Sequence, residues 1–182
     1  MMRTWLTLLV SILLLWPGLL AAQGTDALPP SIRRALDASH PGWRIAPMTD
    51  QVAASWRQSF PAAPANVLQA DYDGNGQTDF AVFIHHSGRS EDGRPMVAGT
   101  ALAFLRRGDR YRPVTVTGPF EIVVNEGAHL WPIVKGDKGW DYEESRAFVF
   151  ERDAIGIRLD SRGPCFDFVH RRGGFVSIWS CD

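Results

Sequence analysis

Carboxylate and amide side chains are concentrated in one short segment, residues 71–79, with the sequence DYDGNGQTD. Side-chain oxygens stand at its first, third, fifth and ninth positions, and the sixth position is a glycine, whose permissive backbone suits a tight turn. A hard cation takes several oxygen ligands at about 2.3 to 2.6 Å, and a chain curling around it delivers alternate side chains and the carbonyl of the seventh residue. The spacing therefore predicts a calcium site with the ligands Asp71, Asp73, Asn75, Gln77 through its carbonyl, and Asp79.

The segment is not an EF-hand, because position 12 is Val82 in the apolar run 80–84, where that loop needs a bidentate Glu. It resembles instead the calcium loops of FG-GAP and VCBS repeats, in which a D-x-D-x-N/D-G-x-x-D turn joins two strands. The resemblance covers residues 66–84 and implies calcium ligation by Asp71, Asp73, Asn75 and Asp79. A propeller needs many such blades, so a single copy implies neither the propeller nor its adhesive functions. The wider layout is similar to that of small periplasmic or secreted bacterial proteins, which implies no activity.

A calcium ion in this loop is expected to be structural, because all its ligands come from one local segment. Without the ion, Asp71, Asp73 and Asp79 would repel one another across a short loop. The alternative is a turn that needs no metal, since Asp, Asn and Gly favour turns through their own backbone hydrogen bonds.

Cys165 and Cys181 flank two apolar-rich runs that meet at Gly173-Gly174, which predicts a β-hairpin. With a loop of Arg172-Gly173-Gly174 the two cysteines lie opposite each other. In that register four apolar residues share one face and both sulfurs lie on the other: Phe166, Phe168, Val176 and Ile178. We expect a disulfide worth about 3 kcal/mol. The alternative is two unrelated buried thiols.

The first 22 residues predict a secretory signal peptide. Arg3 precedes an apolar run over residues 5–15, Pro17-Gly18 interrupts the helix, and small residues end at Ala22. The alternative, a membrane anchor, is disfavoured because a spanning helix wants roughly 20 uninterrupted apolar residues. We therefore expect residues 23–182 to form a single domain, periplasmic or secreted, with no membrane span after cleavage.

Composition and charge exclude other classes of protein. The chain has 182 residues, of which 45% are hydrophobic and 21% charged, and this profile excludes wholesale disorder. The net charge of −1 gives no reason to expect nucleic acid or an anionic membrane as a partner.

The order of elements predicts an α+β fold, with short N-terminal helices followed by a mainly antiparallel β-sheet of meander hairpins. One helix is expected to open at Pro29-Pro30-Ser31 and to end before Pro41-Gly42, and a second to follow its cap at Thr49-Asp50. Strand patterns occupy residues 43–45, 66–70, 80–84, 101–105, 111–116, 121–124, 130–134, 147–150 and 155–159. The polar stretch Ser87–Pro95 is expected to be a loop.

Two further features have ordinary explanations. Arg107-Gly108-Asp109 spells an integrin-binding tripeptide, but it lies between two strand patterns where Gly-Asp is common turn chemistry. Core packing is the usual role of tryptophan, although exposed aromatic residues are favoured at binding surfaces. Five tryptophans follow the predicted signal peptide: Trp43, Trp56, Trp131, Trp140 and Trp179.

The sequence contains two stabilising devices and none of the common local catalytic motifs. We therefore expect an exported calcium-binding domain that acts as a binding protein, its partner a cell-envelope protein or a glycan. One alternative is a periplasmic inhibitor or immunity protein that neutralises a toxin or a hydrolase. Another is a small cell-envelope hydrolase, whose catalytic groups would converge from distant positions.

Overall fold

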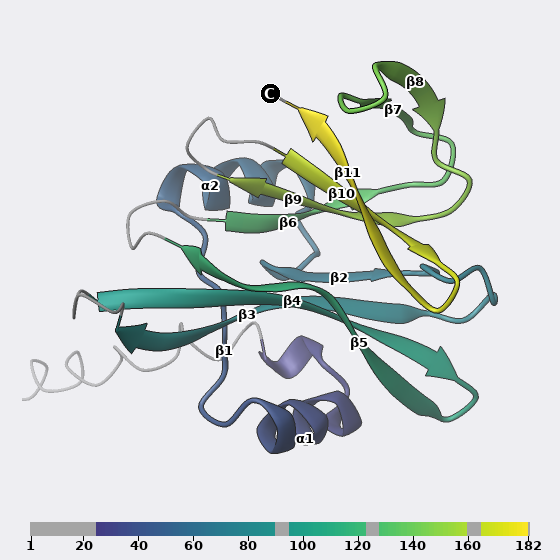
Figure 1. The fold of residues 1–182 in the computed structure, drawn as a ribbon. Helices are drawn as coiled ribbons and strands as arrows, with labels where there is room; N and C mark the ends of the chain where they lie inside the picture. Colours follow the sequence, from purple (N-terminus) through teal and green to yellow (C-terminus); the bar gives the residue numbers. More distant parts are fainter. Residues whose placement is uncertain (1–24, 90–94, 123–127, 160–164, 182) are drawn as a thin grey trace, which may run out of the picture.

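The computed structural model describes residues 25–89, 95–122, 128–159 and 165–181. The predicted signal peptide lies outside the described residues. Two stacked β-sheets form the body of the protein, and a helix covers the outer face of one of them (Figure 1). No helix among the described residues has the length and apolar character needed to cross a membrane.

The first sheet is antiparallel, and its strands follow the order β1-β3-β4-β5, with β2 paired to β3 beside β1. Its members are β1 (Arg44–Ile45), β2 (Val67–Ala70), β3 (Asp79–Arg89), β4 (Pro95–Arg107) and β5 (Arg110–Ile122). Strands β3 and β4 remain paired as far as Arg89 and Pro95, so the expected loop at Ser87–Pro95 is shorter than its polar composition indicates. Residues 90–94 of that loop are not described.

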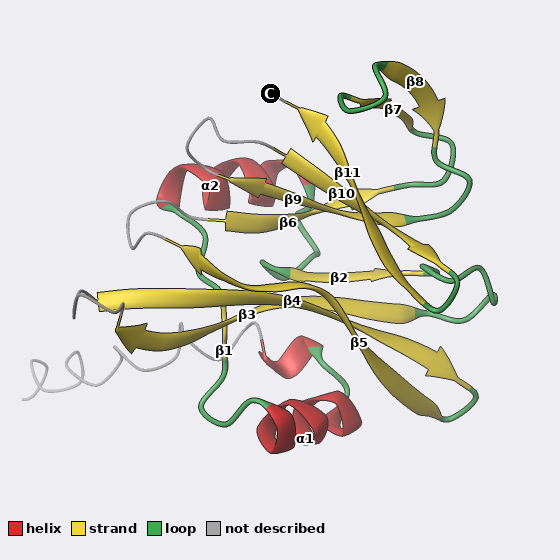
Figure 2. Ribbon diagram, viewed as in Figure 1, coloured by secondary structure: helices red, strands yellow, loops and turns green. Residues whose placement is uncertain are grey.

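The second sheet is also antiparallel, in the order β11-β10-β9-β6. Its members are β6 (Ala128–Ile133), β9 (Ala154–Leu159), β10 (Cys165–Arg171) and β11 (Gly174–Cys181). A separate hairpin, β7 (Lys138–Asp141) and β8 (Arg146–Val149), stands between β6 and β9 in the chain. Figure 2 shows that strands account for most of the architecture.

Two α-helices of ten residues each, α1 (Pro30–Ser39) and α2 (Asp50–Ser59), flank the sheets. Both were predicted, as was the cap of α2, where the Thr49 Oγ1 accepts a hydrogen bond from the Val52 N–H at 3.4 Å. Each helix buries only one or two side chains, whereas the sheets bury each other. The fold is therefore closer to mainly β than to the predicted α+β class, while the antiparallel hairpins are confirmed.

Strand β3 explains how the layers are held together. Phe80, Val82 and Ile84 pack toward Ile32 and Leu36 of α1, while the alternate residues Ala81 and Phe83 pack into the core between the sheets. A strand buried on both faces is apolar at consecutive positions, which accounts for the unbroken run 80–84.

Asn66 joins the two sheets. Its fully buried side chain donates from Nδ2 to the Ala46 carbonyl at 2.7 Å and accepts at Oδ1 from the Leu130 N–H at 2.8 Å. The backbone of Asn66 has a φ of 57°, a region that asparagine enters more readily than most residues. The strand pattern 66–70 predicts Asn66 in a strand, but Asn66 lies in the turn before β2, and this role was not predicted.

The terminal hairpin confirms the disulfide between Cys165 and Cys181, whose Cα atoms are 4.9 Å apart. The expected three-residue loop is wrong, because Arg172 and Gly173 alone form the turn, with φ values of 49° and 88°. Such a pair of positive φ values suits a two-residue hairpin turn. A bulge between Cys165 and Phe166 brings the cysteines back into register.

The corrected register changes the faces of this hairpin. Phe168 lies opposite Ser177 and His170 opposite Phe175, and both Phe168 and His170 are buried. Val176 is 47% exposed and Phe166 is 37% exposed. The predicted apolar face is therefore wrong, because a shift of one residue moves a side chain to the other side of a strand.

Candidate metal centre

Residues 71–79, which we call the acidic loop, connect β2 to β3. The loop brings together Asp71, Asp73 and Asp79, whose ligand oxygens all lie within 4.8 Å of one another. Two unit charges about 4 Å apart interact by roughly 4 kcal/mol at the effective dielectric of a protein surface. Three carboxylates this close therefore need positive charge or hydrogen-bond donors nearby.

The backbone of the acidic loop supplies donors to Asp71. Its Oδ1 accepts a hydrogen bond from the Asn75 N–H at 2.9 Å, and its Oδ2 accepts one from the Gly76 N–H at 2.8 Å. Gly74 and Gly76 have φ values of 74° and 79°, which residues with a side chain rarely adopt. The glycines thus give the chain the tight curl that aims amide groups inward.

Asp79 is completely buried at the start of β3. Its carboxylate accepts hydrogen bonds from the Tyr72 N–H at 3.0 Å and the Arg106 N–H at 2.6 Å. Burial raises the pKa of Asp79 above its ordinary value, the charges of Asp73 and Asp71 raise it further, and the two hydrogen bonds oppose the shift. An ionised Asp79 is therefore a group that a bound cation would stabilise.

Asn75 and Gln77 connect the acidic loop to the turn between β4 and β5. The Asn75 Nδ2 donates to the Arg106 carbonyl at 2.9 Å, and the Gln77 Oε1 accepts from the Gly108 N–H at 3.0 Å. The Asn75 Oδ1 also accepts from the Gln77 N–H at 2.7 Å. The predicted ligand of Gln77 is its backbone carbonyl, which takes no part in these contacts. The Asn75 Oδ1 uses one lone pair and keeps the other for a cation. Both ligand roles therefore stay predictions.

Two arginines bring positive charge to Asp73. Arg107, whose side chain is half exposed, forms an ion pair with the Asp73 carboxylate, which is itself almost fully buried. Arg152, from the turn before β9, donates from Nη1 to the Asp73 carbonyl at 3.0 Å. Its guanidinium lies over Gly74, 3.7 Å from where a Cβ would stand. The loop is thus partly neutralised by the protein itself.

The Arg107-Gly108-Asp109 tripeptide occupies the predicted turn. Gly108 and Asp109 connect the paired residues Arg107 and Arg110, and Gly108 has a φ of 64°. The arginine of the tripeptide is the one that pairs with Asp73.

The second sheet also contacts the acidic loop. The Asp153 carboxylate accepts hydrogen bonds from the Asp71 N–H at 3.3 Å and the Lys135 N–H at 2.9 Å. Tyr72 is buried between the sheets, with its ring 6.4 Å from that of Phe175. Burial raises the pKa of the Tyr72 phenol, as do the charges of Asp153 and Asp79. The loop is therefore held from both layers.

The residues that surround the acidic loop were not predicted from the sequence. A signal was available for Arg106 and Arg107, because an antiparallel pairing of runs 80–84 and 101–105 places the end of the second run beside the start of the first. No comparable signal exists for Arg152 or Asp153, which reach the loop only because the two sheets stack.

Comparisons of the chain with protein-family models, with curated proteins and with solved structures found no match. The residues of the acidic loop do fit a hard divalent cation by their donor chemistry, since three carboxylates converge and further oxygens lie within the same turn.

Proposed function

We propose that this protein is an exported domain that binds a calcium ion in its acidic loop and acts by binding a partner in the cell envelope. The observation that carries the proposal is the convergence of Asp71, Asp73 and Asp79 within 4.8 Å. Carboxylate, amide and carbonyl oxygens suit calcium, which accepts a flexible number of such ligands. The spacing shared with FG-GAP and VCBS loops adds to this argument.

A calcium ion would supply the positive charge that the buried carboxylates need. Asp71 is already oriented by two loop N–H groups, and Asp79 by its two backbone donors, so little reorganisation is needed at either residue. Asp73 would exchange its ion pair with Arg107 for the cation, while the half-exposed Arg107 side chain would keep the hydrogen bond from its Nη1 to the Arg106 carbonyl at 2.9 Å. Binding would strengthen the junction of β2, β3 and the β4–β5 turn.

Calorimetry on chelator-treated protein tests the proposal. We expect uptake of calcium, a rise in melting temperature with calcium, and weaker binding of magnesium. Asp73→Asn should abolish uptake, and it avoids Asp79, whose loss would also leave two N–H groups unpaired. Asp141→Asn is the matched control, because Asp141 accepts backbone hydrogen bonds in the acidic turn between β7 and β8.

Absence of both heat and a melting shift would overturn the calcium proposal. In that case Arg107, Arg152 and the backbone N–H donors compensate the carboxylates, and the loop is the metal-free turn.

A further inference from the structure

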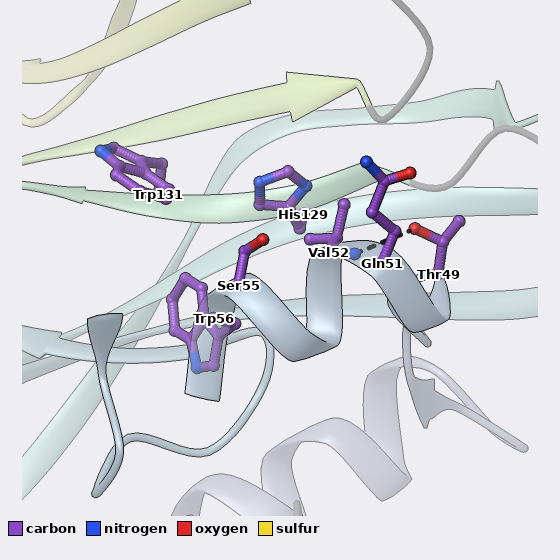
Figure 3. A pocket seen from close by; sticks show the side chains of 7 residues that line it. All are labelled: Thr49, Gln51, Val52, Ser55, Trp56, His129 and Trp131. Carbon is purple, nitrogen blue, oxygen red and sulfur yellow. Dashed lines mark hydrogen bonds between the residues drawn. The ribbon is translucent and has the colours of Figure 1, made fainter. Parts of the chain in front are cut away.

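A second candidate site lies between α2 and the edge strand β6. The cavity has a volume of about 190 Å³, and we call it the tryptophan pocket (Figure 3). Alternate residues of β6 reach it, as do residues one helical turn apart on α2. Its principal residues are Gln51, Ser55, Trp56, His129 and Trp131.

Trp131 is held firmly although it is 37% exposed. Its ring makes edge-to-face contacts with Trp56, Phe60 and His129, at centroid distances of 6.4, 5.4 and 6.4 Å. Trp56 is itself fixed, since its Nε1 donates to the Ala63 carbonyl at 3.0 Å. A rigid exposed aromatic ring offers contact area to a ligand at a low cost in conformational entropy.

Polar side chains accompany this ring. In Figure 3 the Ser55 hydroxyl and the His129 imidazole lie between Trp131 and the amide of Gln51. Hydroxyl and amide groups both donate and accept hydrogen bonds. Among the described residues that line the cavity, none is Asp, Glu, Lys or Arg. This chemistry favours an uncharged ligand with several hydroxyl groups and one apolar face.

We infer that the tryptophan pocket binds a neutral saccharide, with one sugar ring against Trp131 and its hydroxyls bonded to Gln51, Ser55 and His129. Trp56 and Trp131 also border a larger groove of about 650 Å³ between β2 and β6, which leaves room for further sugar rings. The inference rests on the proposed binding role and names its ligand class. The residues that would bond the first sugar ring lie outside the acidic loop, although Tyr72 of that loop and Asp153 line the larger groove.

Calorimetric titration with chitotriose, cellotriose and maltotriose tests this inference. We expect at least one of them to bind with a Kd below about 10 mM. Trp131→Ala should weaken that binding by about tenfold or more. Trp140→Ala is the matched control, because Trp140 is 44% exposed on β7 and lies outside the pocket. Gln51→Ala, at an exposed helix position, should also weaken binding, and this variant does not depend on the packing of Trp131.

Failure of all three sugars to bind would overturn the inference, as would equal losses in the Trp131 and Trp140 variants. Calcium uptake measured on the same sample separates the two proposals. Uptake without sugar binding removes only the saccharide site, and sugar binding without uptake removes only the calcium site.

Discussion

The acidic loop and the tryptophan pocket are candidate binding sites assembled in opposite ways. The three carboxylates of the loop come from nine consecutive residues, and their spacing is legible in the sequence. The pocket joins Gln51 and Ser55 of α2 to His129 and Trp131 of β6, more than seventy positions along the chain. A local site leaves a pattern in the sequence, whereas a site made by packing leaves only its separate residues.

Asn66 connects the two sites. It precedes β2, which leads to the acidic loop, and its side chain accepts a hydrogen bond from the Leu130 N–H. Leu130 lies between the two pocket residues of β6. Asn66→Ala should lower the free energy of unfolding by about 2–5 kcal/mol, since it leaves two buried backbone groups unpaired. Urea denaturation measures this loss. Asn66→Gly should be less damaging by about 1 kcal/mol, because glycine tolerates the positive φ. A loss below about 1 kcal/mol for the alanine variant would show that the sheets do not depend on this side chain.

The disulfide offers a way to lower stability without touching the acidic loop. Replacing Cys165 and Cys181 together with serine should cost about 3 kcal/mol, because the unfolded chain regains the freedom of the closed loop. Calorimetry should show calcium uptake unchanged at a temperature where the variant is folded. Thermal melting of wild-type protein under reducing conditions provides the control. An unchanged melting temperature would contradict the stabilising role.

The pH dependence of stability should reveal His170, which is buried on β10 near the acidic loop. Burial lowers the pKa of His170, the Asp73 charge opposes this shift, and Arg152, Arg112 and Arg107 add to it. The neutral form is therefore favoured in the folded state. The contribution of the neutral His170 to the free energy of unfolding is complete above pH about 6.5. It is lost as the pH falls from there through the lowered pKa of His170.

Chemical denaturation of wild type and His170→Phe between pH 8 and pH 5 measures this contribution. On acidification the variant should lose less free energy of unfolding than wild type. The difference between the two losses should be smaller than the loss expected for the disulfide variant. Asp79 acts in the opposite sense, because its pKa is raised and its protonation at low pH therefore stabilises the folded state. Both proteins contain Asp79, so its effect cancels in the difference between their stability curves. Parallel curves would contradict the prediction.

The smallest expected effect concerns competition at Asp73. Arg107→Gln should tighten calcium binding about two- to fivefold, because solvent at the half-exposed Arg107 side chain weakens the ion pair and the cation no longer has to displace it. Arg110→Gln is the matched control, since it removes the same charge from the other side of the same turn. Calorimetric titration with calcium gives both affinities. Weaker binding in the Arg107 variant would show that the guanidinium supports the site.

Much of the local structure could be predicted because it depends on neighbouring residues. The cap at Thr49, the proline at the start of α1 and the glycines of the acidic loop act within one or two turns of chain. The predicted register of the terminal hairpin was wrong, because Arg172 adopts a positive φ that its residue type alone does not reveal. The fold is closer to mainly β than to the predicted α+β class, because the two sheets bury each other and that burial depends on how they stack.

The sequence by itself determined the existence of the terminal hairpin, the cysteine pairing and the acidic loop, since each depends on the spacing of residues close in the chain. Only the tertiary structure decided that Arg107 and Arg152 meet Asp73, that Asn66 joins the sheets, and that Trp131 is both fixed and exposed. The physical reason is that these contacts form across layers. Their partners are chosen by the packing of whole sheets and helices, and no short-range pattern records that choice.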